Sequence, residues 1–272
     1  MRYELGIVGA GNMAEAIAAG VLRAGVLSAE QIIASNHNSR RLADFASRLG
    51  GIHTTADNRE VAASARVVLL CVKPAKLGEV LHEIAPTAAD DAIYISVAAG
   101  ITTRFIESQL GAAARWRVIR TMPNTPMAVG EGAVGLARGA HATDVDVLAA
   151  RRLLESCADV IEVPEDKIDA VTAVSGSGPA YFFLMVEHMT RAGVELGLTE
   201  TQARSLAAKT ALGAGKMLVA HPDLSAAELR RRVTSPNGTT HAAITSLQSA
   251  GVEDAIVTAV KAAATRAKEL AV

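Results

Sequence analysis

The glycine-rich segment 9–14, Gly-Ala-Gly-Asn-Met-Ala, constrains the fold of this chain more than any other part of the sequence. It follows directly on residues 3–8, an apolar run of strand length, and it leads into residues 13–24, an alanine-rich stretch with helical spacing of its apolar positions. The segment fits G-x-G-x-x-G/A, in which the first glycine makes a tight turn, the second lets a pyrophosphate approach the backbone, and the small last residue lets helix and strand touch. We therefore predict a dinucleotide-binding turn, with a glycine turn that binds nothing as the alternative.

Segments of strand and helix character alternate as far as about residue 163. The expected strands are 3–8, 31–34, 67–72, 92–97, 116–120, 133–136 and 160–163, and the expected helices are 13–24, 39–49, 76–85, 102–110 and 143–157. Such alternation predicts an α/β fold, in which helices cover both faces of a mostly parallel sheet. Together with the glycine turn it predicts a Rossmann-type domain over residues 1–163.

The pattern changes near Pro164, beyond which no segment is typical of a strand. Expected helices cover 179–196, about 199–219, a segment that begins at Ser225, a segment after 233–241 that runs through about Leu247, and 252–270. The first half of 179–196 is apolar on almost every face, so it needs cover on most faces. We therefore predict an all-helical domain, residues 164–272, that packs against a second copy of itself. A helix enclosed within one compact domain is the alternative.

Three helix starts carry capping residues. Ser177 is an expected N-cap, just before Pro179. Thr199 with Gln202, and Ser225 with Glu228, fit the capping-box pattern.

Composition excludes several classes of function. There are 27 basic and 28 acidic residues, and only 3% of residues are aromatic, so no basic surface or stacking platform for nucleic acid is expected. Two distant cysteines make neither a disulfide scaffold nor a zinc site, and the seven histidines have no metal-ligand spacing. We expect a cytoplasmic protein with no metal and no membrane or nucleic-acid partner.

The residues after the second expected strand bear on the choice of dinucleotide. An NAD site usually has an acidic residue there, whereas residues 35–41 of this chain read Ser-Asn-His-Asn-Ser-Arg-Arg. Arg40 and Arg41 can pair with a 2′-phosphate that a carboxylate would repel. We therefore expect NADPH as the cofactor, with NADH as the alternative if the two arginines only solvate a helix face.

Three more segments follow expected strands, at 71–74, 97–100 and 122–126. The carboxyl ends of parallel strands lie at one edge of a sheet, where open α/β sheets bind ligands, so we expect a shared pocket. Asn124 can present its amide to a ligand carboxamide. Cys71 is expected to be a buried thiol with no role as a nucleophile.

Two segments of the second half are rich in glycine and hydroxyl groups. Residues 173–181 precede the apolar helix, and residues 233–241 contain Ser235, Thr239 and Thr240 around a Pro-Asn-Gly turn. Successive N–H groups at such a turn suit a substrate carboxylate, and the hydroxyls suit a nitrogen. Simple helix capping is the alternative for both segments.

Six motifs follow one another along nearly the whole chain. They are Gly9-Ala10-Gly11-Asn12-Met13, Val72-Lys73-Pro74, Ala98-Ala99-Gly100, Asn124-Thr125-Pro126, Ser175-Gly176-Ser177-Gly178-Pro179-Ala180-Tyr181 and Ser235-Pro236-Asn237-Gly238-Thr239-Thr240. Together they resemble the pyrroline-5-carboxylate reductase family, and the last two are far more specific than the dinucleotide pattern. The resemblance implies an N-terminal Rossmann domain, a helical domain interleaved with that of a partner subunit, and homodimers that can assemble into decamers.

The resemblance also implies an activity, the reduction of the cyclic imine L-1-pyrroline-5-carboxylate to L-proline with NAD(P)H. It implies that Thr240 contacts the imine nitrogen as the catalytic residue. It further implies that Ser235 and the N–H groups of Gly238 and Thr239 hold the substrate carboxylate, with Ser175 at the same site. The expected cofactor-binding residues are Val8, Gly9, Ala10, Gly11, Asn12, Met13, Ser35, Asn36, Arg40, Asn58, Cys71, Val72, Lys73, Pro74, Val97, Ala98, Ala99 and Asn124.

The chain departs from the family pattern at three positions. Ala14 stands where many members have glycine, Arg231 replaces a commonly acidic residue, and Asn237 replaces a glycine. Asparagine tolerates a left-handed backbone, so the last change is compatible with the same turn. The hydroxyl motif contains no strong general acid, so the expected proton source is a substrate that arrives as the protonated iminium.

Two other functions compete with this interpretation. A dehydrogenase of the β-hydroxyacid type needs a catalytic lysine on a helix, and neither Lys209 nor Lys216 lies in the Gly-x-x-x-Lys-x-x-Asn context. A dinucleotide-sensing regulator would have lost its chemistry, whereas the hydroxyl groups at 234–240 are all present.

Overall fold

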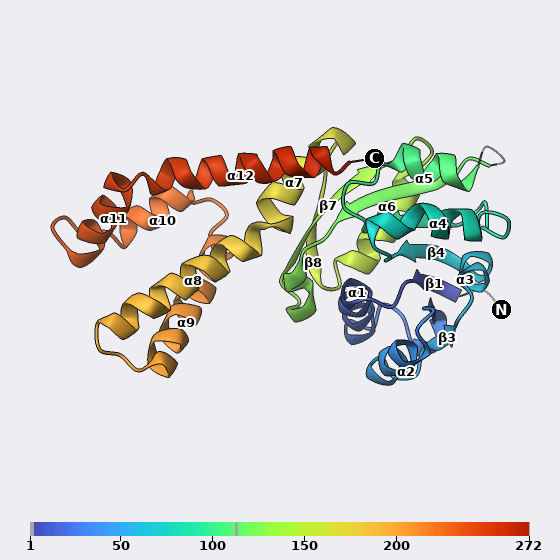
Figure 1. The fold of residues 1–272 in the computed structure, drawn as a ribbon, viewed down its shortest axis with the longest axis horizontal. Coiled ribbons are helices and arrows are strands. Elements are labelled where there is room, and N and C mark those ends of the chain that lie inside the picture. The colour runs from blue at the N-terminus through green and yellow to red at the C-terminus, as the bar shows by residue number, and fades with distance from the viewer. Residues whose placement is uncertain (1–2, 112–113, 272) are drawn as a thin grey trace. The chain divides into compact units, whose positions relative to one another are not determined.

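The computed structural model describes residues 3–111 and 114–271, and the chain forms two compact units (Figure 1). The first unit, here called the sheet unit, comprises Met1–Ser177 and Ala263–Val272. The second, here called the helical unit, comprises Gly178–Ala262. The sheet unit therefore extends beyond the last strand and takes in the end of the chain. At Gly100 (φ +75°) an added Cβ would lie 2.6 Å from the carbonyl oxygen of Leu270, so the two segments are in tight contact.

The sheet unit is built on an eight-stranded sheet of order β3-β2-β1-β4-β5-β6-β7-β8. The strands are β1 Tyr3–Val8, β2 Ile32–Ser35, β3 His53–Thr55, β4 Ala65–Leu70, β5 Ile93–Ser96, β6 Arg117–Met122, β7 Gly132–Arg138 and β8 Ala158–Glu162. Among the described strand pairs only β6–β7 is antiparallel, which confirms the predicted mostly parallel sheet. Strand order reverses between β1 and β4, and ligands of open α/β sheets bind beside such a reversal.

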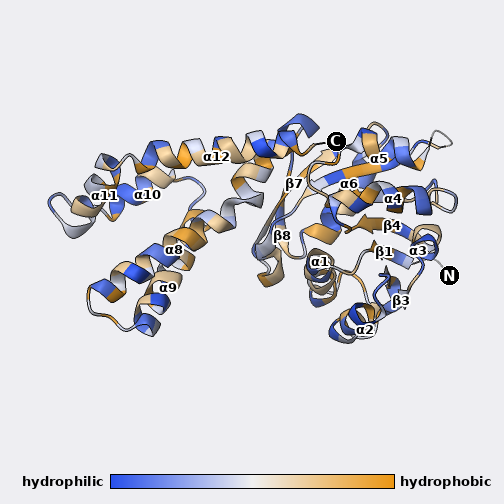
Figure 2. Cartoon of the chain, viewed as in Figure 1, coloured by the Kyte–Doolittle hydropathy of each residue, from blue (hydrophilic) through white to orange (hydrophobic). Residues whose placement is uncertain are grey.

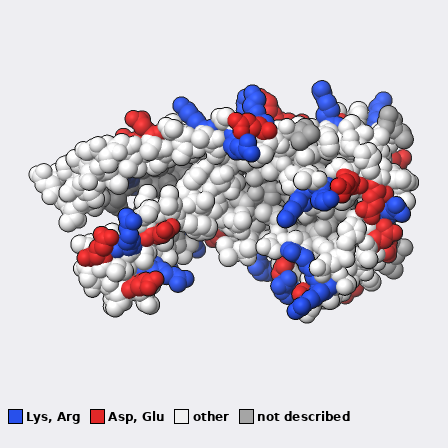
Figure 3. Space-filling view, viewed as in Figure 1, with Lys and Arg blue, Asp and Glu red and all other residues white. Residues whose placement is uncertain are grey.

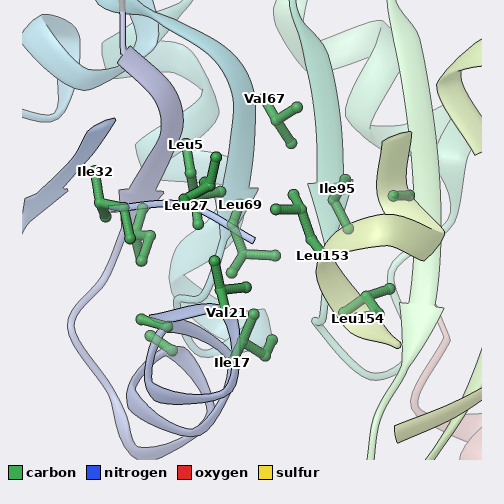
Figure 4. Packing of buried hydrophobic residues seen from close by; sticks show 14 of the residues in the cluster. Leu5, Ile17, Val21, Leu27, Ile32, Val67, Leu69, Ile95, Leu153 and Leu154 are labelled. Carbon is green, nitrogen blue, oxygen red and sulfur yellow. The ribbon is translucent and has the colours of Figure 1, made fainter. Parts of the chain in front are cut away.

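Helices cover both faces of this sheet. They are α1 Asn12–Arg23, α2 Ser39–Arg48, α3 Asn58–Ser64, α4 Pro74–Ile84, α5 Thr103–Leu110, α6 Asp144–Leu154 and the short α7 Ile168–Val171. Side chains of α1, α2 and α6 pack on one face, where Ile17, Val21 and Leu154 approach the strands (Figure 4). Side chains of α3, α4 and α5 form the core on the other face. The predicted α/β class is confirmed.

β3, α3 and the short α7 have no counterpart in the sequence prediction. β3 is three residues long and mostly exposed, and α3 follows it after a short turn, so neither has a clear apolar period. The strand predicted at 67–72 begins at Ala65 and ends at Leu70. Cys71 and Val72 are apolar, which extended the predicted strand, but they belong to the loop after β4.

The helical unit has no strand among its described residues, as predicted. Its helices are α8 Gly178–Glu195, α9 Glu200–Ala220, α10 Ala226–Arg232 and α11 Thr239–Ser249, and α12 Val252–Glu269 begins in this unit and ends in the sheet unit. Large apolar side chains of α8 are exposed, among them Phe182 and Phe183 at 66% and 67%. In Figure 2, which colours the ribbon by hydropathy, part of α8 has the hydrophobic colour. One subunit therefore leaves this helix without the cover that its sequence requires.

The capping predictions have different outcomes. The Thr199–Gln202 capping box is formed in both directions. Ser225 accepts a hydrogen bond from the Glu228 N–H at 3.1 Å, but the Glu228 carboxylate pairs with Arg231 and Arg232 on its own helix and returns no bond. The two arginines lower the pKa of the Glu228 carboxyl.

Candidate active site

A cavity of about 630 Å³ lies beside the carboxyl ends of β1, β2 and β4. Its lining comprises Gly9, Gly11, Ser35, Asn36, His37, Asn38, Arg41, Asn58, Cys71, Val72, Lys73, Lys76, Glu79, Val80 and Glu83. It contains both glycines of the fingerprint and the residues that follow β2. This is the place in the sheet where a dinucleotide is expected.

The two glycines of the turn meet different requirements. Gly9 has φ +100°, and a Cβ there would lie 2.8 Å from the Cys71 carbonyl oxygen, so the turn needs glycine for its own shape. Gly11 has an ordinary φ of −93°, and a Cβ there would approach only the same oxygen, at 3.8 Å. Gly11 is also the N-cap of α1, with no side-chain hydrogen bond to the first turn. The helix start is therefore open, with N–H groups free to bind a phosphate.

Arg41 holds the glycine turn from the neighbouring helix. Its Nε donates to the Ala10 carbonyl oxygen at 2.7 Å, and its Nη2 donates to Asn12 Oδ1 at 3.0 Å. The N-cap Asn38 accepts from the Arg41 N–H at 3.0 Å, which fixes the first turn of α2. Arg41 lines the cavity and Arg40 does not. The sequence analysis considered both arginines and listed Arg40 among the cofactor-binding residues, whereas Arg41 is the one that lines the cavity. Their order along a helix start does not show which one faces the turn.

A buried polar network forms another wall of the cavity. Ser35 Oγ donates to Asn58 Oδ1 at 2.7 Å, and Asn58 Nδ2 donates to Glu83 Oε2 at 2.9 Å. Ser35 and Asn58 are buried. These bonds fix the orientation of Asn58, whose Nδ2 lies 3.5 Å from His37 Nε2. The sequence analysis selected Asn58 and did not select His37.

Cys71 and Lys73 lie where β4 gives way to α4. The Cys71 N–H donates to the Val8 carbonyl oxygen at 2.8 Å, and the half-buried thiol lines the cavity. Burial raises the pKa of this thiol, which keeps it protonated and makes it a poor nucleophile. Lys73 is the N-cap of α4 and Pro74 its first residue, so the sharp turn at this motif is a helix start.

Several predicted cofactor residues lie outside the cavity wall. They are Val8, Ala10, Asn12, Met13, Arg40, Pro74, Val97, Ala98, Ala99 and Asn124. Val97, Ala98 and Ala99 follow β5 at the same edge of the sheet, and the Val97 N–H donates to the Leu70 carbonyl oxygen at 3.3 Å. Asn124 is buried, with Oδ1 accepting from the Ala133 N–H at 2.9 Å and Nδ2 donating to the Ser175 carbonyl oxygen at 3.1 Å. Its amide thus anchors the Ser175 motif and the start of β7.

The glycine-serine motif forms a π-helical turn, Thr172–Gly176, between α7 and α8. The Ser177 N–H donates to the Thr172 carbonyl oxygen at 2.8 Å, five residues back. The predicted N-cap at Ser177 is wrong, because the chain is already helical there (φ −84°, ψ −21°). Ser175 Oγ donates to the Val171 carbonyl oxygen at 3.0 Å, so this hydroxyl is left with its lone pairs to accept a bond. Single π turns inside helices are frequent at functional sites.

The hydroxyl motif of the helical unit ends in an open helix start. Asn237 has φ +57°, the left-handed backbone expected of it, and the Gly238 N–H donates to the Ser235 carbonyl oxygen at 3.0 Å. Gly238 is the N-cap of α11, and no side chain caps that helix. The N–H groups left for a ligand are therefore those of Thr239, Thr240 and His241, because the N–H of Gly238 is used within the turn and that of Ala242 makes the first helical bond. The capping interpretation of this motif is not supported.

Comparison with known proteins identifies the family of this chain. Residues 165–270 match the family model described as pyrroline-5-carboxylate reductase dimerisation, and residues 4–100 match one described as NADP oxidoreductase, coenzyme F420-dependent. The pyrroline-5-carboxylate reductase of Pseudomonas aeruginosa is 42% identical over 269 residues, which is 98% of this chain and 97% of that protein. The chain belongs to the pyrroline-5-carboxylate reductase family.

Solved structures of the family have the same fold. A pyrroline-5-carboxylate reductase from Coxiella burnetii superposes with a TM-score of 0.91 at 38% identity, covering 100% of both chains. The Plasmodium falciparum pyrroline carboxylate reductase, solved with NADP bound, gives 0.87 at 27% identity, covering 99% of this chain and 98% of that one. The chain is therefore an NAD(P)H-dependent oxidoreductase with a dimerisation domain, and both competing functions are set aside.

Three further features concern metal groups, membrane-spanning helices and surface charge. Among the described residues, no group of three or more His, Cys, Asp or Glu side chains comes together as a metal site requires. None of the described helices has the length and apolarity needed to cross a membrane. On the face shown in Figure 3, acidic and basic side chains are mixed, in line with the formal net charge of −1.

Proposed function

We propose that the chain reduces L-1-pyrroline-5-carboxylate to L-proline with NADPH, the sheet unit binding the cofactor and the turn at 235–240 binding the substrate. The observation that carries the proposal is the open start of α11. Its N–H groups are not capped by any side chain, and the Thr239 and Thr240 hydroxyls lie on its first turn. Such a start binds a small carboxylate and leaves a hydroxyl for a neighbouring nitrogen.

The cavity of the sheet unit suits NADPH. The open space at Gly11 admits a pyrophosphate, and the start of α1 supplies N–H groups to it. Asn36 and Arg41 would contact the 2′-phosphate, and Ser35 with Asn58 forms the polar wall beside them. When bound, the reduced nicotinamide supplies the hydride. The other predicted contacts after β4, β5 and β6 would enclose the nicotinamide end.

The substrate motif performs the remaining work. Ser235 and the N–H groups of Thr239 and Thr240 hold the carboxylate, and the Thr240 hydroxyl accepts from the iminium N–H. This bond orients the ring and favours the protonated, more electrophilic form. The Ser175 hydroxyl donates to Val171, so towards the substrate it would act as a second acceptor that shares the single iminium N–H with Thr240. Orientation of this kind makes a bimolecular step effectively unimolecular.

The decisive assay follows NADPH absorbance with and without pyrroline-5-carboxylate, with proline measured as the product. We expect stoichiometric oxidation of NADPH and formation of proline, and a protein that consumes no NADPH when the imine is added refutes the proposal.

We further propose that the exposed apolar residues of α8 pack against a second copy and that the site is complete only in the dimer, which can assemble into decamers. Activity per subunit should then fall on dilution below the dimer dissociation constant, and a fully active monomer contradicts it.

Arg41→Ala tests the choice between the two arginines. Loss of a charge-assisted bond to the 2′-phosphate costs about 1.5–3 kcal/mol, so KM for NADPH should rise about 10- to 100-fold. KM for NADH should rise less, because NADH has no 2′-phosphate and loses only the support that the Arg41 bond to the Ala10 carbonyl oxygen gives to the glycine turn. Arg40→Ala is the matched control and should change neither value. Equal losses for both cofactors would limit Arg41 to holding the turn.

A further inference from the structure

The segment from Glu165 to Gly176 lies along β6 and β7, within the sheet unit, towards the carboxyl end of β6. Near its start, Asp169 lies beside Arg120 of β6. Further along, an added Cβ at Gly135 of β7 would lie 2.6 Å from Val171, and one at Gly176 would lie 2.6 Å from Met122 Cε. At its end, Asn124 holds the carbonyl oxygen of Ser175. The segment is thus attached by a polar contact at each end, with close apolar contacts between them.

The first of these attachments is a buried charge cluster. The Arg120 side chain is only 5% exposed, and its Nη1 lies 3.5 Å from Glu165 Oε1 and its Nη2 lies 3.6 Å from Asp169 Oδ1. Glu165 is fixed separately, because both its oxygens accept bonds of 2.8 Å from the N–H and hydroxyl of Thr103. Arg120 Nε, Arg120 Nη2 and Asp169 Oδ1 are buried with no hydrogen-bond partner.

A buried charge cluster with unmade hydrogen bonds contributes little to the stability of a fold. Burying a charge is costly, and the cost is recovered only when its hydrogen bonds are made with good geometry. The same strand carries a comparison, because Arg117 Nη1 donates to the buried Asp146 Oδ1 at 3.1 Å. Asp146 has further bonds from Thr143, so that pair is satisfied where the Arg120 cluster is not. Buried polar groups left in such a state call for a functional explanation.

We propose that Arg120 is a positioning residue that sets the place of the π turn, and through it the Ser175 hydroxyl, for binding of the imine. Arg120 attracts the carboxylate of Asp169, six residues before Ser175. Asn124 donates a hydrogen bond to the Ser175 carbonyl oxygen within the π turn. The two contacts determine where along β6 the π turn begins. This inference rests on the proposed function, because Ser175 was there placed at the substrate.

The test compares two changes in one strand, Arg120→Met and Arg117→Met. The first leaves the part-buried Glu165 and Asp169 without their arginine, and the second does the same to the buried Asp146. Both should lower the melting temperature. Only Arg120→Met should raise KM for pyrroline-5-carboxylate, by roughly 10- to 100-fold, the effect of a misplacement of about 1 Å. KM for NADPH should stay within about twofold of the parent value, because the cofactor cavity does not include the segment. If Arg120→Met does not fold, Asp169→Asn serves in its place.

A double-mutant cycle with Ser175→Ala separates positioning from plain destabilisation. If Arg120 acts through Ser175, the double variant should have the same KM for the imine as the more affected single variant, because the second change has nothing left to remove. Three results would overturn the inference. The first is a double variant whose rise in KM for the imine is the product of the two single rises. The others are a Ser175→Ala variant with unchanged KM, and equal kinetics for the Arg117 and Arg120 variants. A parent enzyme that does not reduce the imine refutes the proposed function instead, and the inference falls with it.

Discussion

Gly9→Ala should abolish productive NADPH binding and destabilise the sheet unit at the same time. The alanine Cβ would lie 2.8 Å from a backbone oxygen of Cys71, at a φ of +100° that side chains avoid. Strain of this kind costs about 1–3 kcal/mol, and the turn can relieve it only by moving the N–H groups that face the phosphates. We expect KM for NADPH to rise at least about 100-fold, with a lower melting temperature in differential scanning calorimetry.

Gly11→Ala is the matched control for that prediction. Its Cβ has room in the free protein and its φ is ordinary, so the melting temperature should hold. The same methyl group would occupy the space of the pyrophosphate, so NADPH binding should still be lost. A Gly9→Ala enzyme with parent stability and parent KM would mean that the turn is not built as described.

Thr240→Ala should lower kcat/KM for pyrroline-5-carboxylate by about 10²- to 10³-fold, the usual loss when one oriented hydrogen-bonding group is removed from a reacting centre. The melting temperature should change little, because this hydroxyl caps no helix in the structure. Thr240→Ser retains the hydroxyl and should recover most of the rate. Steady-state kinetics under saturating NADPH measure all three enzymes.

Thr234→Ala is the control for that series. Thr234 is near in sequence, but its hydroxyl donates to the Arg230 carbonyl oxygen at 2.7 Å and is used within the fold. Its removal should cost some stability and leave kcat/KM close to the parent value. An unchanged kcat/KM in Thr240→Ala would remove this residue from the mechanism.

The elements found from sequence are those with a strong apolar period or a capping pattern. β1, α1 and the capping box at Thr199 belong to this group, because burial on one side or a local hydrogen bond specifies them. β3 and α3 were missed because β3 is short and exposed and pairs only with the edge of β2. The position of β3 depends on its pairing with β2, and the residues of β3 and α3 alone do not predict it.

The candidate site shows the same division. The two glycines of the turn, the segment after β2 and the hydroxyl turn were all found from their residue types. The role of Arg41, the buried Arg120 and the π turn were not, because each depends on contacts between segments far apart in the chain. Ser177 looked like a cap because serine and proline favour helix starts, and only the preceding α7 shows that the helix has already begun.

The helical unit is an insertion in the chain of the sheet unit, which it leaves after Ser177 and rejoins at Ala263. Two peptide connections therefore link the two units, and the second of them, at Ala263, falls within the continuous helix α12. Proteolytic nicking at one connection would leave the other intact. Exchange of this module between related enzymes would likewise need two crossovers, which favours inheritance of the two bodies as a pair.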